Sequence, residues 1–438
     1  MQASKTFTLV VIPAPTGRTF YVSPAGSDSA AGTSAAPWKT LQKAAGSAAA
    51  GDTVVVAAGT YVGFAFQPGT TQQGTAAKPI TFVANTGDYR TSGVVINAIP
   101  SVSGVLSPVW LYGSGYIVVK GFNVTSNTSK GNFQVAGGSP GCQIISCHSY
   151  GTPYWGVKAG EGSDGLLIQD CLCENSAGQH GIYVAGCNGY TIRGNVCRNN
   201  KADSDGIHTN VEDGGNLINT NGLIENNVCY GNALAGMDLT GMSNSVVRNN
   251  LCYGNGRHAI VLQNSNNNAT PACHDNVIEN NTFDATAGSS AYAIEIAGLS
   301  SQPSGSTWTS NCDNTTIFNN ILLGPSGAGN GAIGLLGTQP SSFRSDYNVV
   351  ANVFTKGSSS ETLAQWLTAT GQDAHSVVSS ATALFTNPSA GDYTLKAGSP
   401  AIDAGTASFN GVSAPPADIT GTSRSKGAGI DIGAYESF

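Results

Sequence analysis

Between residues 156 and 297 the chain repeats a short phrase made of a small residue, an aliphatic residue or Met, and a variable residue. The copies are Gly156-Val157-Lys158, Gly181-Ile182-Tyr183, Gly206-Ile207-His208, Gly236-Met237-Asp238, Ala259-Ile260-Val261 and Ala293-Ile294-Glu295. They recur every roughly 20–35 residues, a period typical of solenoids. Because neighbouring side chains of a strand point to opposite faces, the middle residue should face the core and the variable residue the solvent.

A second repeated phrase lies between the copies of the first. When its copies are aligned, two further columns of equivalent positions appear. One column is amide: Asn195, Asn227, Asn250, Asn281 and Asn320. The other is apolar: Cys173, Cys197, Cys229, Cys252, Phe283 and Leu322. Stacked Asn amides can bond to the coils above and below, while the apolar column fills the interior. The pattern predicts an all-β, single-domain, right-handed parallel β-helix.

The ends of the chain depart from the repeat. Residues 1–18 are interpreted as a residual strand and linker from a preceding module, because Lys5–Val11 alternates and is similar to the last strand of an immunoglobulin-like module. Residues 19–438 form the β-helix domain. A solenoid needs caps over its apolar ends. We expect a short helical cap and the first coils within residues 19–62, and the last coils and a C-terminal cap within residues 350–438. Helical spacing occurs at Pro37–Ala44 and Glu361–Leu367.

Composition restricts the possible partners. The 57 Gly suit many tight bends, only 10% of the residues are charged, and the net charge is −7. No basic run is present, so nucleic acid is not an expected partner. No apolar run is long enough to span a bilayer, so membrane insertion is not expected either. We expect a monomer.

The chain has 10 Cys, and no CxxC pair shows metal spacing. Cys273 and Cys312 lie outside the apolar column, in successive coils, and could form a disulfide. Cys142 and Cys187 form a second possible pair.

The variable residues of the first phrase form the candidate site. Successive coils lie about 4.8 Å apart, so Lys158, Tyr183, His208 and Asp238 should form one row on one face. A base, a phenol, an imidazole and a carboxylate in contact can perform acid–base chemistry. The candidate catalytic residues are Lys158, Tyr183, Asp205, His208 and Asp238. Flanking columns supply the candidate substrate-binding residues Trp155, His180, Asn210, His258 and Gln263, and the cation Arg257 is a further candidate.

A mixed polar row is also what solvent exposure produces on any solenoid. The clustering of three His residues with Asp203, Asp205 and Asp238 in a chain so poor in charge favours a functional site. Glu212 and Asp213 lie in an insertion that could form one wall of a groove. Glu295 is expected to be a surface residue.

The beginning of the β-helix domain carries a resemblance to a known family. The residues that carry it are Tyr21-Val22-Ser23-Pro24, Gly26, Asp28, Gly51-Asp52-Thr53-Val54 and Gly59-Thr60-Tyr61. This opening resembles that of secreted β-helix polysaccharide-degrading proteins of the pectate-lyase-like superfamily, including family 9 pectate lyases. The resemblance covers only the first coils. It implies a secreted, extracellular protein that acts on a polysaccharide, and the end of the chain resembles a segment common in secreted bacterial β-helix proteins.

The first functional hypothesis is a polysaccharide lyase that cleaves a uronic-acid-containing glycan by β-elimination in a groove on the β-helix. Lys158 or His208 would remove the C5 proton and Tyr183 would protonate the leaving oxygen. Arg257, Lys158 or a Ca²⁺ ion would neutralise the carboxylate. Asp203, Asp205 and Asp238 are the candidate Ca²⁺ ligands, since oxygen ligands suit this ion. Family 9 lyases use an Asp cluster for Ca²⁺ and a Lys base, but their Asp-Asp-Gly-x-x-Asp run is absent here, and Lys158 precedes the acidic coil.

Two other hypotheses remain open. A glycoside hydrolase needs two carboxylates beside the scissile bond, and Asp203-Ser204-Asp205-Gly206-Ile207 is similar to the Asn-Thr-Asp-Gly-Ile strand of β-helix polygalacturonases. Asp205 matches their catalytic position, Asp238 matches half of their Asp-Asp pair, and their Gly-His-Gly motif is absent. A non-catalytic glycan-binding module would show an exposed aromatic ladder, and Trp155, Tyr183 and Tyr292 are too scattered for one. The lyase is preferred, then the hydrolase, then the binding module.

Overall fold

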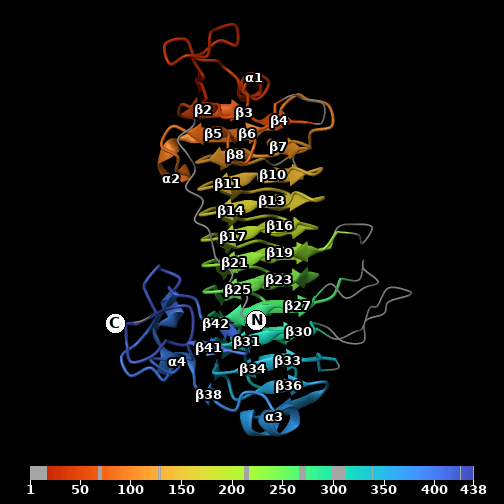
Figure 1. The fold of residues 1–438 in the computed structure, drawn as a ribbon, viewed down its shortest axis with the longest axis vertical. Helices are drawn as coiled ribbons and strands as arrows, with labels where there is room; N and C mark the ends of the chain where they lie inside the picture. Colours follow the sequence, from red (N-terminus) through yellow and green to blue (C-terminus); the bar gives the residue numbers. More distant parts are fainter. Residues whose placement is uncertain are drawn as a thin grey trace, which may run out of the picture.

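The computed structural model of the chain is an elongated column of stacked coils (Figure 1). It describes residues 17–437 except 68–71, 127, 129, 212–216, 266–272, 298–311, 338 and 425. Three twelve-stranded sheets run along the column. Nearly all their strands pair in parallel with the equivalent strand of the next coil, and the last pair of sheet 3 is antiparallel. The predicted all-β parallel β-helix is confirmed. The strand expected at Lys5–Val11 lies outside the described residues.

The strands are short, as the repeat period requires. Sheet 1 contains β1 (Thr19–Val22), β2 (Thr53–Val56), β5 (Ile80–Ala84), β8 (Ile117–Lys120), β11 (Gln143–Ile145), β14 (Leu167–Gln169), β17 (Thr191–Arg193), β21 (Leu223–Glu225), β25 (Val246–Arg248), β28 (Val277–Glu279), β31 (Thr316–Phe318) and β34 (Arg344–Asp346). Sheet 2 contains β3 (Gly59–Val62), β6 (Val94–Ala98), β9 (Asn123–Val124), β12 (His148–Tyr150), β15 (Leu172–Glu174), β18 (Val196–Arg198), β22 (Val228–Tyr230), β26 (Leu251–Tyr253), β29 (Thr282–Asp284), β32 (Ile321–Leu323), β35 (Val349–Val350) and β38 (Val377–Val378).

Sheet 3 carries the candidate site. It contains β4 (Phe64–Phe66), β7 (Val109–Tyr112), β10 (Gly131–Ala136), β13 (Trp155–Gly160), β16 (Ile182–Ala185), β19 (Ile207–Asn210), β23 (Met237–Thr240), β27 (Ile260–Gln263), β30 (Tyr292–Ile296), β33 (Gly331–Leu335), β36 (Phe354–Lys356) and β37 (Ser359–Glu361). Shorter pairs are β20 (Asn219–Thr220) with β24 (Met242–Ser243), β39 (Phe385–Asn387) with β40 (Asp392–Leu395), and β41 (Ser408–Phe409) with β42 (Val412–Ser413). The helices are α1 (Leu41–Ala45), α2 (Tyr89–Ser92), α3 (Leu363–Thr370), α4 (Ala381–Leu384) and the 3₁₀ turn η1 (Pro388–Ala390).

The interior of the column is formed by the predicted apolar columns. Cys173 pairs with Cys197, Cys197 with Cys229, and Cys229 with Cys252, and all four side chains are fully buried. The column then continues to Phe283 and Leu322. Each of these residues is the middle one of a three-residue strand, so it points inward while its neighbours point outward.

A ladder of Asn amides links successive coils by hydrogen bonds at the turn from sheet 1 to sheet 2. Each amide nitrogen donates to the Oδ1 of the next Asn at 2.9–3.2 Å, and the ladder runs through Asn195, Asn227, Asn250, Asn281, Asn320 and Asn348. A second ladder, through Asn200, Asn232 and Asn255, follows the Cys column by three residues and was not predicted. The ladders satisfy buried polar groups in the core, which would otherwise cost stability.

Two helices close the ends of the column (Figure 1). Helix α1 begins after Thr40, whose side chain accepts the N–H of Lys43, so it starts later than the predicted Pro37. Leu41, Ala44 and Ala45 of α1 are buried. Helix α3 has a capping box and buries Trp366 against Phe354 at a ring-centroid distance of 4.7 Å.

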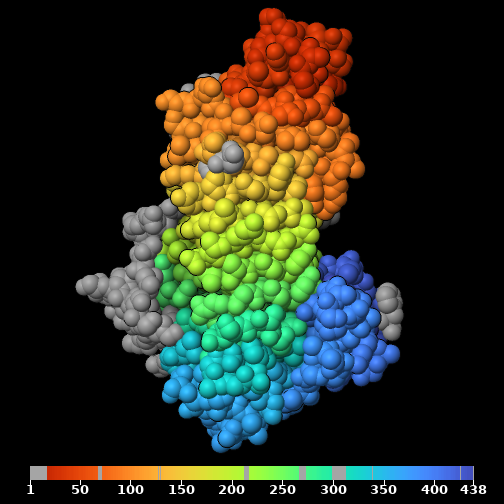
Figure 2. Space-filling view, turned by 180° about the vertical axis from the view of Figure 1, so that it is seen from behind, coloured from red at the N-terminus to blue at the C-terminus, as the bar shows by residue number. Residues whose placement is uncertain are grey.

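Residues 381–437 lie along the side of the column and do not cover its end (Figures 1 and 2). Leu251, Ile321, Leu323 and Val349 pack there with residues such as Leu384 and Tyr393. Arg424 Nη2 donates to Asn249 Oδ1 at 2.8 Å. These residues cover apolar side chains on the outer face of sheet 2, while helix α3 closes the end of the column, within the range 350–438 that was expected to hold the C-terminal cap.

Cys273 and Cys312, the first of the two possible pairs, form a disulfide. Cys142 and Cys187 are buried thiols, so the alternative pairing of these two residues is wrong. Within the described part of the chain, no helix has both the length and the apolar character needed to cross a bilayer.

The Asn ladder should be a major source of stability. Asn250→Ala would remove the Oδ1 that accepts the backbone N–H and the side-chain amide of Asn227, and the amide that donates to the carbonyl oxygen of Ile224, at about 1–3 kcal/mol for each buried group left unsatisfied. We expect the free energy of unfolding, measured by chemical denaturation, to fall by at least about 2 kcal/mol. Asn97→Ala, at an exposed position of β6, is the control and should change it by less than about 0.5 kcal/mol. Equal effects of the two substitutions would contradict the ladder's role.

Candidate functional site

The predicted row exists on sheet 3. In register, Lys158 pairs with Tyr183, Tyr183 with His208, and His208 with Asp238. The row continues through Val261 to Glu295. Strands β13, β16, β19 and β23 therefore bring together side chains that lie far apart in the sequence. We call Lys158, Tyr183, His208 and Asp238 the candidate catalytic row.

The small residue of each phrase is required because successive coils approach closely beside the row. A Cβ on Gly206 would lie 2.6 Å from the carbonyl oxygen of Gly236 and 3.0 Å from the amide nitrogen of Asn232. A Cβ on Gly181 would lie 2.7 Å from the carbonyl oxygen of Gly206. Larger residues would push the coils apart and break the register that builds the site.

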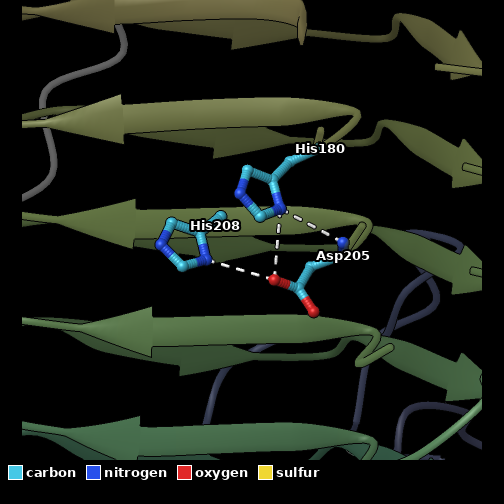
Figure 3. Close-up of side chains that lie close together, drawn as sticks. All are labelled: His180, Asp205 and His208. Atoms are coloured by element: carbon cyan, nitrogen blue, oxygen red, sulfur yellow. Dashed lines mark hydrogen bonds and ion pairs between the residues drawn. The ribbon is translucent and has the colours of Figure 1, made fainter. Parts of the chain in front are cut away.

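Asp205 is a buried anion directly behind the row. Its Oδ1 accepts the backbone N–H of Ala235 at 2.8 Å, and its Oδ2 lies 3.1 Å from His208 Nδ1 (Figure 3). Burial by itself would raise the pKa of the Asp205 carboxyl, but its contacts with His180 and His208 hold that pKa well below the ordinary value. Asp205 therefore carries a negative charge at neutral pH.

The carboxylate of Asp205 determines which nitrogen of His208 holds a proton. A carboxylate only accepts hydrogen bonds, so His208 Nδ1 must donate, and Nε2 is the atom that can gain or lose a proton. Burial acts to lower the pKa of His208. The negative charges of Asp238 and Asp205, together with the Asp205 hydrogen bond, outweigh burial and raise this pKa above its ordinary value.

His180 packs against His208 from the preceding coil. The two rings stack at a centroid distance of 4.1 Å and an angle of 12° (Figure 3). His180 Nδ1 lies 3.1 Å from both the backbone nitrogen and Oδ2 of Asp205. The backbone N–H can only donate and the carboxylate oxygen can only accept, so His180 Nδ1 faces a donor and an acceptor at the same distance. Burial lowers the pKa of His180, which keeps this ring uncharged beside His208.

Asp238 occupies the far end of the candidate catalytic row. Its Oδ1 accepts the Thr240 hydroxyl at 2.6 Å, and its Oδ2 lies 3.8 Å from His208 Nδ1. Gln263 Nε2 donates to Thr240 Oγ1 at 2.9 Å and lies 3.4 Å from both Asp238 oxygens. Burial raises the pKa of Asp238. Thr240 was not among the predicted residues, although its spacing of two from Asp238 places it on the same face of β23.

The other end of the row is cationic and aromatic. Lys158 Nζ lies 5.3 Å from the centre of the Trp155 ring. The Trp155 ring lies 6.0 Å from the Tyr183 ring, which stacks on His208 at 5.3 Å and 12°. Lys158 has no acidic partner among the described residues, so its charge is available to a ligand carboxylate.

The remaining predicted substrate-binding residues have different surroundings. Asn210 ends β19, and its Oδ1 accepts the Val211 N–H and the Ser265 hydroxyl at 2.8 and 3.0 Å. Arg257 is exposed. His258 Nε2 lies 3.0 Å from Glu295 Oε2. Glu295 was expected at the surface, but its side chain is only 13% exposed. Its position in the same column as Asp238 was the signal that could have identified it.

The side chains do not fit the predicted Ca²⁺ site. Asp203 is exposed and makes no hydrogen bond to Asp205 or Asp238 within the described part of the chain. The ligand atoms that converge are those of His180, Asp205 and His208, all within 4.8 Å of one another (Figure 3). Calcium takes six to eight oxygen ligands, whereas two of these three donors are imidazoles. Glu212 and Asp213 lie outside the described residues.

Two family models match the chain. The model described as "Pel9A-like, right handed beta helix region" matches residues 20–181. The model described as "Right handed beta helix region" matches residues 109–354, more than half of the 438 residues. A search of curated proteins finds no match.

Solved structures with the same fold include two lyases. The crystal structure of pectate lyase Pel9A is 17% identical, with 96% of each chain covered and a TM-score of 0.62. A mannuronic acid specific polysaccharide family 6 lyase from human gut microbiota is 16% identical, with 83% of each chain covered and a TM-score of 0.51. At these identities the likeness shows that the fold is shared.

The pKa values of the two stacked histidines, His180 and His208, should be shifted in opposite directions. We expect the pKa of His208 to lie above, and that of His180 below, the ordinary value of about 6.5. Histidine ring NMR signals followed against pH, and assigned by single His→Gln substitutions, measure both. Asp205→Asn removes the buried charge and should lower the pKa of His208. An unchanged His208 titration in that variant would show that Asp205 does not control this ring.

Proposed function

The chain belongs to the family of right-handed β-helix proteins, and we propose that it is a carbohydrate-active enzyme, a polysaccharide lyase that cleaves a uronic-acid-containing glycan by β-elimination. The observation that carries the proposal is the stack of Lys158, Tyr183 and His208 in adjacent coils, with Asp205 buried behind His208. The lyase activities named for the two solved structures support the reaction class. We further propose that the protein is secreted and monomeric.

His208 is the proposed general base. Asp205 fixes Nδ1 as the protonated nitrogen, which leaves Nε2 to take the C5 proton of the uronate. The buried negative charge of Asp205 also stabilises the imidazolium that forms. His180 stacks on the same ring and holds its orientation, so we regard it as a positioning residue.

Lys158 and Tyr183 lie on the two coils that precede the coil of His208, and they supply the other groups that the reaction requires. Lys158 neutralises the uronate carboxylate, which makes the adjacent C5 proton more acidic. The electron pair of the C5–H bond forms the C4–C5 double bond as the C4–O bond breaks. The Tyr183 hydroxyl supplies the proton that the leaving oxygen requires. The proton gained by His208 returns to Tyr183 through solvent.

The hydrolase alternative receives less support from this geometry. A general acid must reach the glycosidic oxygen and hold a proton. Asp205 is 3% exposed, both of its oxygens are already bonded within the protein, and its pKa is lowered. Asp238 alone does not supply the required pair. Calcium stays a prediction, and no step of the proposed mechanism depends on it.

An activity assay with matched variants tests the proposal. On a panel of uronic-acid and neutral glycans, we expect new reducing ends together with ultraviolet absorbance of an unsaturated product. Tyr183→Phe and His208→Ala should each lower kcat by about 10²–10⁴-fold, since each removes a proton-transfer group. Tyr150→Phe, on β12 of sheet 2, is the control and should retain activity.

Several outcomes of this assay count against the proposal. Reducing ends without absorbance would indicate a hydrolase, and binding without either product would indicate a binding module. Full activity of Tyr183→Phe and His208→Ala would show that the candidate catalytic row is not the active site. Activity that requires added Ca²⁺ and is abolished by a chelator would support the metal prediction over the Lys158 role.

A further inference from the structure

Beyond Asp238, the same column of sheet 3 carries a second polar pair that the proposed mechanism does not use. Val261 is the next residue in the column, and Glu295 follows it. Glu295 Oε2 lies 3.0 Å from His258 Nε2. We call Glu295 and His258 the distal pair.

The hydrogen bonds of the distal pair define its charge. His258 Nδ1 accepts the backbone N–H of Tyr292 at 3.2 Å, so the proton of the neutral ring resides on Nε2 and is donated to Glu295. The His258 and Tyr292 rings stack at 5.8 Å and 4°, which holds this orientation. His258 therefore binds Glu295 as a neutral donor and does not neutralise its charge.

The other charged groups around the distal pair act on Glu295 in opposite directions. The charge of Asp238 raises the pKa of Glu295, whereas the exposed cation Arg257 lowers it without forming an ion pair with it among the described residues. Burial raises the pKa of Glu295 to about 7 and lowers that of His258 to about 4. Glu295 Oε1 has no hydrogen-bond partner within the described part of the chain, so it is available to a ligand.

The column is therefore asymmetric in charge. Lys158 supplies a cation without an acidic partner at one end, and Asp238 and Glu295 supply carboxyl groups at the other. A sugar carboxylate is favoured beside Lys158. The same carboxylate beside Glu295 would meet a like charge in a partly buried site, where repulsion is strong. A sugar hydroxyl can instead donate to Glu295 when it is ionised, or accept from it when it is protonated.

We infer that Glu295 and His258 form a binding subsite for a sugar unit without a carboxylate. This inference rests on the proposed lyase function and narrows its substrate class. The substrate is a heteropolymer in which a uronate at Lys158 is accompanied, further along the column, by a neutral sugar at Glu295. A continuous polyuronate is disfavoured because it would place a carboxylate there.

Binding measurements in the Tyr183→Phe background test the subsite without turnover. Calorimetry would compare an all-uronate oligosaccharide with one of equal length that alternates uronate and neutral sugars. We expect tighter binding of the alternating ligand at pH 8, and a smaller preference at pH 6, where Glu295 is mostly protonated. Adding Glu295→Gln, which keeps the side-chain shape and removes the charge, should reduce the preference at pH 8 about tenfold or more.

The matched control is Glu174→Gln, on β15 of sheet 2, which removes one negative charge elsewhere and should leave the preference unchanged. Equal binding of the two ligands, or a preference that Glu295→Gln does not alter, would overturn the subsite. Discrimination between the ligands in the Tyr183→Phe background, together with no cleavage of either ligand by the protein that retains Tyr183, would instead leave the subsite standing and reject the lyase function.

Discussion

Parallel backbone pairing between successive coils is the constraint on which the molecule depends. Each strand of sheet 3 contributes one outward residue to a common column, and the pairing keeps those residues at the coil spacing of about 4.8 Å. Buried Asn amides reinforce the pairing at two of the turns, through hydrogen bonds of 2.8–3.2 Å between adjacent coils. The small residues beside the column allow this approach, because a Cβ at Gly206 would meet the next coil's backbone. A slip of one residue would turn the column's side chains inward.

The side chains of the site are buried to different extents, and this difference determines which of them can act on a substrate. Asp205 precedes the small residue of its coil and is withdrawn from solvent, where it acts on His208 and not on a ligand. His208, Tyr183 and Lys158 project from strands that expose their variable position. The buried Asp205 carboxylate thus prepares the His208 imidazole for proton transfer. The cation Lys158, one coil beyond Tyr183, is available to bind the substrate carboxylate. This division of roles distinguishes the site from a pair of equally accessible carboxylates.

The charge asymmetry of the column links the site to the proposed substrate. Lys158 and Glu295 lie at opposite ends of one line of paired residues. A polymer bound along this line would experience attraction at one end and repulsion of its carboxylates at the other. The elongated fold supplies the length that such discrimination needs.

The amino-acid sequence alone predicted the repeat, the fold class and the vertical order of Lys158, Tyr183, His208 and Asp238, because period and strand alternation are local properties of the chain. It also indicated one Asn ladder and the Cys273–Cys312 disulfide. The folded structure added that Asp205 is buried behind His208, that Asp203 is exposed, that Glu295 is bound by His258, and that residues 381–437 cover a flank of the column. These outcomes depend on how turns between sheets direct their side chains and on which outer faces other segments cover. Such contacts join residues whose spacing in the chain carries no periodic signal.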